Sequence, residues 1–338
     1  MPEFFGRFAG ETFEEPAERR RFGKAEIVTD LLDGEVGTGS KKVLCLRSKV
    51  LLDIAYMQKK RYLCSEFLYM QKIADILQSF EPISLAQMES VKLMNRIDTK
   101  YAVPMTVLPL ILEAAKADYY VQEIDGKRIA TYDTMYYDTA TLDMYIRHHD
   151  RQLVRQKIRV RQYVDSNLTF LEIKRKNNKG RTSKKRIVVP GFDITADTPS
   201  VLKHKRKEDE AVTVERFIDS KSRYHWSDIT PHLWTKFHRI TLVNKAKTER
   251  LTIDMDLVWD NVVSGEVKTY KDLVIVELKR DGNVPSKMTH IMLDLRLHPL
   301  KISKYCIGTA LTTPEIKKNR FKSKIRKIEK MLNTYDPS

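Results

Sequence analysis

The segments VRQKIRVRQYV (residues 154–164) and LTFLEIKRK (residues 168–176) decide the fold, because charged and apolar residues alternate in both. Side chains two residues apart in a β-strand point to the same face, so each segment has one apolar face and one basic face. The turn residues Asp165, Ser166 and Asn167 between them predict a hairpin. The two segments therefore predict adjacent antiparallel strands that share a basic face.

The same alternation recurs later in the chain, in WTKFHRITLVN (234–244), ERLTIDMDLVWD (249–260) and DLVIVELKR (272–280). If the resulting sheet closes on itself, its basic face lines a tunnel, which suits a polyanion and a divalent metal better than it suits a core. The charged residues that we expect on this face are Lys157, Arg159, Arg161, Glu172, Lys174, Lys176, Arg250, Asp254, Asp256, Glu277 and Lys279.

Composition narrows the class of partner. The 338-residue chain is 42% hydrophobic, enough for a sizeable core, and its formal net charge is +16. This charge indicates an anionic partner: nucleic acid, anionic lipid or a phosphate-rich small molecule. The longest apolar stretch, residues 101–115, contains two prolines and is shorter than the roughly 20 residues of a membrane span, so we expect no transmembrane helix.

The three cysteines, Cys45, Cys64 and Cys306, are far apart and odd in number, which favours a reducing cytoplasm. Residues 1–69 lack a clear packing partner and are expected to be a poorly packed extension. Residues 70–310 carry the alternating strands, and residues 311–338 are expected to contain a basic amphipathic helix. Helical patterns are also predicted over 107–117, 141–150 and 286–297, with a charged helical insertion over 197–227.

Taken in order, several short motifs resemble the VTC domain, the polyphosphate polymerase branch of the CYTH-like triphosphate tunnel enzymes. The resemblance spans roughly residues 88–306. It implies an α+β fold, an antiparallel eight-stranded β-barrel with surrounding helices, whose lumen binds triphosphate or polyphosphate with a metal. The motifs are RIDTKY (96–101), YYDT (136–139), KIRVRQY (157–163), FLEIKRK (170–176), FHRITLVNK (237–245), ERLTIDMDL (249–257), VIVELKR (274–280) and SKYC (303–306).

The resemblance also assigns roles to residues. Glu277 matches the metal-binding glutamate, and Ser303 with Lys304 matches a phosphate-binding segment. Arg239 and Arg250 match an arginine pair on neighbouring strands. The residues expected in catalysis are Glu277, Arg239, Arg250 and Lys304, and those expected in substrate binding are Lys100, Arg159, Arg161, Lys174, Lys279 and Ser303.

The implied reaction is transfer of the ATP γ-phosphoryl group to inorganic polyphosphate, with Mn²⁺ or Mg²⁺, in a cytoplasmic phosphotransferase. A triphosphate hydrolase or nucleotide cyclase of the same fold is an alternative, and so is a non-catalytic module that binds polyphosphate or nucleic acid. Arg96, Asp98 and Lys100 stand where wider CYTH enzymes have two glutamates and a lysine, which disfavours a two-metal hydrolase. No sequence-specific nucleic acid is expected, and whether the protein has a membrane partner is left open.

Overall fold

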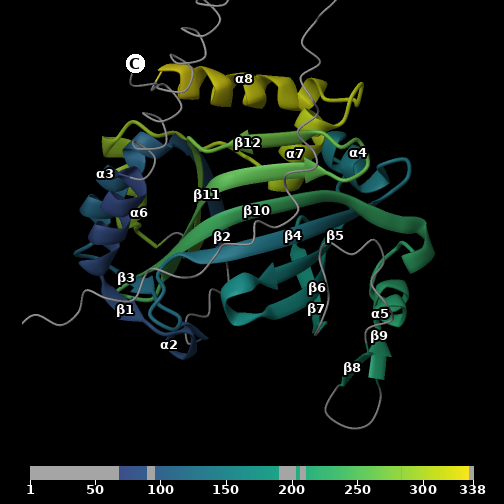
Figure 1. Cartoon of the computed structure of the whole chain (residues 1–338), viewed down its shortest axis with the longest axis horizontal. Helices are drawn as coiled ribbons and strands as arrows, with labels where there is room; N and C mark the ends of the chain where they lie inside the picture. The colour runs from purple at the N-terminus through teal and green to yellow at the C-terminus, as the bar shows by residue number, and fades with distance from the viewer. Residues whose placement is uncertain (1–67, 90–95, 190–202, 206–210, 283, 335–338) are drawn as a thin grey trace, which may run out of the picture. The chain divides into compact units, whose positions relative to one another are not determined.

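An antiparallel sheet frames the part of the chain that the computed structural model describes, which is residues 68–89, 96–189, 203–205, 211–282 and 284–334. Its main path runs β2-β13-β11-β10-β4-β5-β6-β7, and each neighbouring pair on this path is antiparallel (Figure 1). In chain order these strands are β2 (Arg96–Pro104), β4 (Ala130–Thr139), β5 (Arg155–Tyr163), β6 (Leu168–Lys176), β7 (Thr182–Val188), β10 (Ile229–Asn244), β11 (Glu249–Asn261) and β13 (Leu273–Asp281). The predicted α+β class and antiparallel eight-stranded frame are confirmed.

Shorter strands extend this sheet, and helices pack around it. β12 pairs with β11, β3 pairs with β10, and β1 runs parallel to β3, while β8 and β9 form a separate pair. These strands are β1 (Glu81–Ile83), β3 (Tyr119–Gln122), β8 (Lys203–Lys205), β9 (Ala211–Thr213) and β12 (Val267–Tyr270). Besides helical residues 68–78, the helices are α2 (Leu85–Glu89), α3 (Leu108–Ala115), α4 (Asp143–His149), α5 (Val214–Lys221), α6 (Lys287–Asp294), α7 (Lys304–Thr312) and α8 (Asn319–Thr334).

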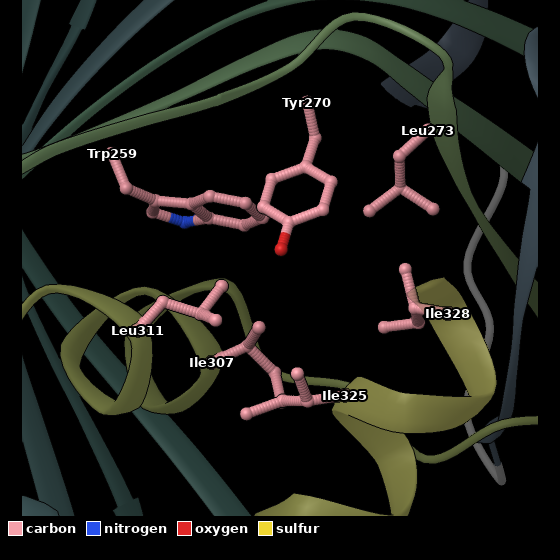
Figure 2. A pocket seen from close by; sticks show the side chains of 7 residues that line it. All are labelled: Trp259, Tyr270, Leu273, Ile307, Leu311, Ile325 and Ile328. Atoms are coloured by element: carbon pink, nitrogen blue, oxygen red, sulfur yellow. The ribbon is translucent and has the colours of Figure 1, made fainter. Parts of the chain in front are cut away.

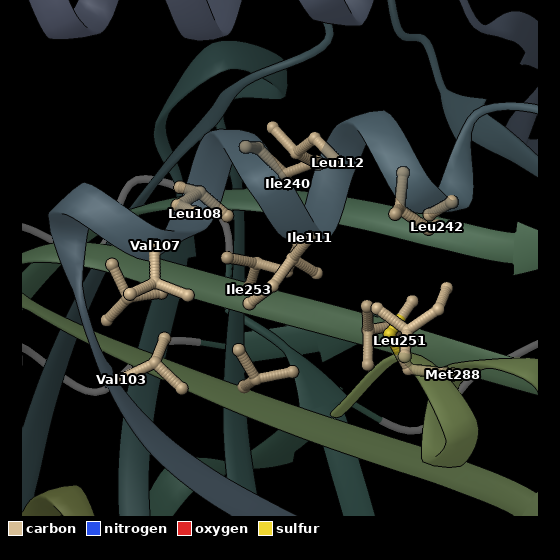
Figure 3. Close-up of a cluster of buried hydrophobic side chains, with 14 of the residues drawn as sticks. Val103, Val107, Leu108, Ile111, Leu112, Ile240, Leu242, Leu251, Ile253 and Met288 are labelled. Atoms are coloured by element: carbon tan, nitrogen blue, oxygen red, sulfur yellow. The ribbon is translucent and has the colours of Figure 1, made fainter. Parts of the chain in front are cut away.

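One apolar face of the sheet packs against α3 and α6 (Figure 3). Val103 of β2, Ile240 of β10 and Ile253 of β11 are buried there with Leu108 and Ile111 of α3. Burial of a side chain of this size contributes about 1.5–3 kcal/mol. Because strand side chains alternate, the residues between these apolar ones point to the opposite face, which we call the inner face.

A second apolar cluster covers the outer side of the hairpin that the sequence predicted. Ile158 of β5 and Ile173 of β6 are buried with Phe217 and Ile218 of α5. The hydroxyl of Thr213 caps α5 by accepting a hydrogen bond from the backbone N–H of residue 216 at 3.1 Å. The charged residues of β5 and β6 therefore share the inner face.

A third cluster covers one end of the inner face, where α7 packs against the sheet. Tyr305 and Ile307 of α7 are buried with Phe237 of β10 and Trp259 of β11, and α8 adds Phe321 and Ile328. Figure 2 shows a small pocket in this region whose lining is apolar apart from a tyrosine hydroxyl and an indole nitrogen. The lining residues are Trp259, Tyr270, Leu273, Ile307, Leu311, Ile325 and Ile328.

The sheet is not closed by strand pairing in the described residues, because β7 and β2 form no ladder with each other. Residues 299 and 300 pair with the free edge of β2 instead. The N–H of Leu300 donates to the carbonyl of Lys100 at 2.7 Å, and Lys157 Nζ of β5 donates to Ser303 Oγ at 2.7 Å. The segment before α7 thus links the β2 side of the sheet to the β5 side.

The structure corrects one predicted strand pattern. Between the pairs Lys236–Val258 and His238–Met255, one residue of β10 stands opposite two residues of β11. Asp256 lies in this bulge with φ of 53°, and its carboxylate contacts His238 Nδ1 at 2.8 Å, on the outer side. The prediction that Asp256 shares the basic face with Arg250 and Asp254 is wrong.

The predicted helical insertion over 197–227 is also wrong in extent, since its described residues form β8, β9 and the short helix α5. Charge content alone does not separate exposed helices from exposed hairpins, which explains the error. The predicted extension over residues 1–69 lies outside the described residues, except for its last two. In the described part no helix is long and apolar enough to cross a membrane.

Gly308 offers a test of how tightly α7 packs. A Cβ at this position overlaps Trp259 Cδ1 and lies 2.8 Å from Leu233 Cδ2. We expect Gly308→Ala to lower the free energy of unfolding by about 1–3 kcal/mol through overpacking, measured by urea denaturation. Ser323→Ala, on the exposed face of α8, is the control, and equal stability of the two variants would contradict the close packing.

Candidate functional site

The inner face carries far more cations than carboxylates. Across its strands, Lys100 stands opposite Glu277, Arg239 opposite Asp254, and Arg159 opposite Glu172. The cations of this face include Lys100, Lys157, Arg159, Arg161, Lys174, Lys184, Arg239, Arg250 and Lys279, and Lys304 joins them from α7. This surplus makes the inner face a strong binding surface for a polyanion.

Asp254 is held by two cations from different elements. Arg239 Nε and Nη2 donate to its two oxygens at 2.5 and 2.8 Å, and Lys304 Nζ also contacts the carboxylate. The Asp254 side chain is 2% exposed. Burial acts to raise its pKa, but Arg239 and Lys304 outweigh burial and hold the pKa of Asp254 well below its usual range. Asp254 is therefore a fixed anion and a poor proton acceptor.

Glu172 has a matching arrangement on β6. Arg159 Nε donates to Glu172 Oε2 at 2.8 Å, and Lys184 of β7 contacts Oε1. Burial acts to raise the pKa of Glu172, but Arg159, Arg161 and Lys184 lower it to about 2. This carboxylate, like Asp254, holds neighbouring cations in place.

Glu277 differs because it has lysines but no short ion pair. Its oxygens lie 3.5 Å from Lys100 Nζ and 3.4 Å from Lys279 Nζ, and its side chain is 17% exposed. Burial opposes ionisation, but Lys279, Lys100, Arg239 and Lys304 lower the pKa of Glu277 below its usual range. Among the described residues, Glu277 is the inner-face carboxylate with the loosest contacts.

The donor set limits which metal site is feasible. In the described residues no three His, Cys, Asp or Glu side chains are grouped as metal ligands. A hard divalent ion fits at Glu277 only if phosphate oxygens and water supply its remaining ligands, as Mg²⁺ sites often do. The residues present are compatible with an ion that arrives with the phosphate substrate.

The start of α7 is fixed on the inner face by a buried carboxylate. Asp138 at the end of β4 accepts hydrogen bonds from the N–H groups of Met144 and Tyr145, both at 2.9 Å, and from the Tyr305 hydroxyl. Tyr305 directly follows Lys304 in the chain. The Asp138–Tyr305 contact therefore holds Ser303 and Lys304 against the sheet, and α4 with them.

Arg161 and Arg250 on the inner face have no carboxylate at ion-pair distance in the described part of the chain. Arg161 Nε donates to Thr134 Oγ1 at 3.1 Å. Burial and neighbouring arginines lower the pKa of both. The Arg161 guanidinium lies over the rings of Tyr132 and Phe237, with its carbon 5.5 and 5.8 Å from their centroids. In the described part of the chain no carboxylate neutralises these two arginines at close range.

The family comparison agrees with this geometry. The family described as the VTC domain matches residues 95–313, which is more than half of the chain. The chain belongs to the VTC domain family. No curated protein sequence matches the chain.

Solved structures give weaker likenesses. A candidate adenylate cyclase from Vibrio parahaemolyticus is 10% identical, with 64% of this chain and 99% of that chain covered and a TM-score of 0.38. A candidate adenylyl cyclase from Hippeastrum, described as having a dominant triphosphatase activity, is 12% identical, with 65% and 98% covered and a TM-score of 0.39.

The VTC domain brings the residues predicted from the sequence together on one face. Arg239 and Arg250 lie on neighbouring strands, as expected, but are not opposite each other: Arg239 faces Asp254 and Arg250 faces Val243. The predicted site residues found on the inner face or at the start of α7 are Lys100, Arg159, Arg161, Lys174, Arg239, Arg250, Glu277, Lys279, Ser303 and Lys304.

Several residues that shape this face are missing from the site predicted from the sequence. Asp254 and Glu172 were expected on the face, but their role in fixing arginines was not. Lys184 and Asp138 were not predicted, although Lys184 alternates with Arg186 in β7 and Asp138 lies in the YYDT motif. Their partners are distant in sequence, so no local pattern reveals the contacts.

Substitution of Arg239, which has a carboxylate partner, and of Arg250, which has none in the described part of the chain, should have opposite effects on stability. Arg239→Gln leaves Asp254 buried with one cation, so we expect a loss of about 3–5 kcal/mol in unfolding free energy. Arg250→Gln relieves repulsion from Arg96 and Arg239, so we expect the melting temperature in phosphate-free buffer to rise by about 2 °C. Both variants should gain less thermal stability than the parent when tripolyphosphate is added.

Thermal unfolding with and without tripolyphosphate measures both effects. Lys116→Gln, an exposed substitution on the far side of α3 from the inner face, is the control. A large stability loss in Arg250→Gln, matching that of Arg239→Gln, would contradict the distinction drawn between the two arginines.

The lowered pKa of Lys279 predicts that the affinity for an anion depends on pH. Burial lowers its pKa to about 8, with Arg239 and Arg250 acting in the same direction and Glu277 opposing them. A lysine with a lowered pKa is charged below that pH and neutral above it, so affinity for tripolyphosphate should fall by about tenfold between pH 7 and pH 9. Lys279→Arg keeps its charge and should reduce this fall.

Calorimetric titration at the two pH values measures the difference between parent and variant. Ionisation of tripolyphosphate and of Tyr136, whose pKa the surrounding cations lower to about 8 against the effect of burial, affects both proteins equally. An identical pH dependence in the two proteins would show that Lys279 does not titrate in this range.

Proposed function

We propose that this VTC domain is a polyphosphate polymerase that transfers the γ-phosphoryl group of ATP to the end of an inorganic polyphosphate chain. The observation that carries the proposal is the state of the inner-face carboxylates. Asp254 and Glu172 are each bound by two cations, Asp98 accepts a hydrogen bond from Arg96 Nε at 2.6 Å, and Glu277 has a lowered pKa. The face is thus rich in groups that bind phosphate and poor in groups that accept a proton.

This excess of phosphate-binding groups over proton-accepting groups favours polyphosphate over water as the acceptor of the phosphoryl group. Hydrolysis is assisted by a general base that takes a proton from the attacking water, whereas the terminal phosphate of polyphosphate is already ionised at neutral pH. In the transfer step an oxygen of that phosphate forms a bond to the γ-phosphorus. The bond from the γ-phosphorus to the β,γ-bridging oxygen breaks, and ADP leaves with the electron pair. No proton transfer is required.

The residues of the inner face then position and neutralise the phosphates. Arg161 and Arg250 bind non-bridging oxygens, and Lys100, Lys174 and Lys279 add positive charge along the chain. Arg239 and Arg159 are oriented by their carboxylate partners. Charge that develops in the transition state meets groups already in place, so little reorganisation is needed.

Ser303 and Lys304 contribute at the start of α7. Ser303 Oγ accepts from Lys157 and also caps the helix by accepting from the N–H of Cys306 at 3.3 Å. A hard divalent ion held by Glu277, either Mn²⁺ or Mg²⁺, would neutralise further phosphate charge when it is bound. These assignments follow the motif matches and the shared location of the side chains.

Product analysis tests the reaction. Purified protein is incubated with ATP and Mn²⁺, and ADP, free phosphate and a polyphosphate ladder on a gel are measured. A polymerase releases ADP with little free phosphate and produces the ladder. Equal amounts of ADP and free phosphate without a ladder would overturn the proposal in favour of a triphosphate hydrolase.

Glu277→Gln tests the metal assignment. We expect metal-dependent turnover to fall at least 100-fold, because a ligand for charge neutralisation is lost, while the fold and tripolyphosphate binding are retained. Glu113→Gln, the same chemical change on the exposed side of α3, is the control. Full activity of Glu277→Gln would remove this residue from the mechanism.

A further inference from the structure

A cluster of aromatic side chains lies where β5 ends and β6 begins, six residues along β5 from Lys157, which contacts Ser303 ahead of α7. Tyr163 of β5 contacts Tyr132 of β4, with ring centroids 4.9 Å apart, and meets Phe170 of β6 edge to face at 5.6 Å. Tyr163 and Phe170 are both half-buried. The role assigned to the charged residues of this face does not account for these partly exposed rings.

The strand register places these rings directly beyond a phosphate-binding residue. Arg161 stands opposite Phe170, and Tyr163 is two residues further along the same face. Tyr132 belongs to the apolar cluster that includes α7 and Tyr163 packs against its edge, while Lys157, near the other end of β5, contacts Ser303. A phosphate chain that reaches Arg161 therefore has one end beside Tyr163 and Phe170.

Arg186 of β7 adds a flat cation to the cluster. Its guanidinium carbon lies 4.6 Å from the centroid of Phe170, and the side chain is otherwise exposed. A guanidinium stacked on a ring has a second planar side, which can stack on another flat group. Its charge also suits the innermost phosphate of a nucleotide.

We propose that Tyr163, Phe170 and Arg186 form a stacking site for the base of a nucleoside triphosphate whose phosphates occupy the inner face. The inference rests on the proposed function, and it identifies where the nucleoside lies. Aromatic rings and arginine planes stack on bases without reading their edges, so adenine and guanine nucleotides should bind alike.

Two ligands distinguish binding at the proposed base site from binding at the phosphate site. Adenylyl imidodiphosphate carries a base, and tripolyphosphate does not. Phe170→Leu keeps an apolar side chain but removes the ring, and Arg186→Lys keeps the charge but removes the plane. We expect each variant to bind the nucleotide analogue about 5- to 20-fold more weakly, and tripolyphosphate within twofold of the parent.

Calorimetric titration of the full chain measures both affinities, and thermal unfolding checks that each variant folds. Tyr120→Leu is the control, because this ring carries Lys245 at 5.8 Å from its centroid but belongs to β3, away from the inner face. Because Arg186 is exposed, its variant keeps the test valid if Phe170→Leu is unstable.

The outcomes are distinct. Selective loss of nucleotide affinity supports the stacking site. Equal weakening of both ligands, or no effect on either, overturns it and assigns the rings a packing role. Failure of the parent to bind tripolyphosphate overturns the proposed function and the stacking site together, whereas tripolyphosphate binding with no added affinity for the nucleotide overturns the stacking site alone.

Discussion

The carboxylate of Asp254 joins a strand and a helix that are far apart in the sequence. It binds Arg239 from β10 and Lys304 from α7 while almost fully buried, so neither cation is left without a counter-charge. A buried charge that loses its partner costs several kcal/mol, and this cost opposes movement of α7 away from the sheet. The position of Ser303, the edge of β2 and the order of the inner face depend on the same contact.

The cations of the inner face fall into two groups, according to whether they have a carboxylate partner. Cations that have a carboxylate partner hold elements together, whereas Arg161 and Arg250 interact mainly with other cations and aromatic rings in the described part of the chain. Mutual repulsion of this kind lowers stability without a ligand and strengthens the binding of an anion. Stability and anion affinity are therefore in opposition at these two positions.

The sequence predicted the strands well, because alternation in segments such as 154–164 is a local signal. It predicted the shared face of Arg159, Glu172 and Glu277 for the same reason. It failed at Asp256, where one bulge changes the face of every later residue, and alternation carries no sign of a bulge. It also does not predict the Asp138–Tyr305 contact, which joins residues 167 positions apart, or the pairing of residues 299 and 300 with the edge of β2.

The edge strand β7 affects how the protein can associate with other molecules in solution. Within the described residues its second edge pairs with no strand, and such an edge can add a strand from another molecule and begin aggregation. Lys184, Lys185 and Arg186 are consecutive and exposed on this strand. Two copies that approach edge to edge bring these cations together, so the charge repels self-association. Residues at the border of the inner face thereby also disfavour pairing of this free sheet edge with a second copy of the chain.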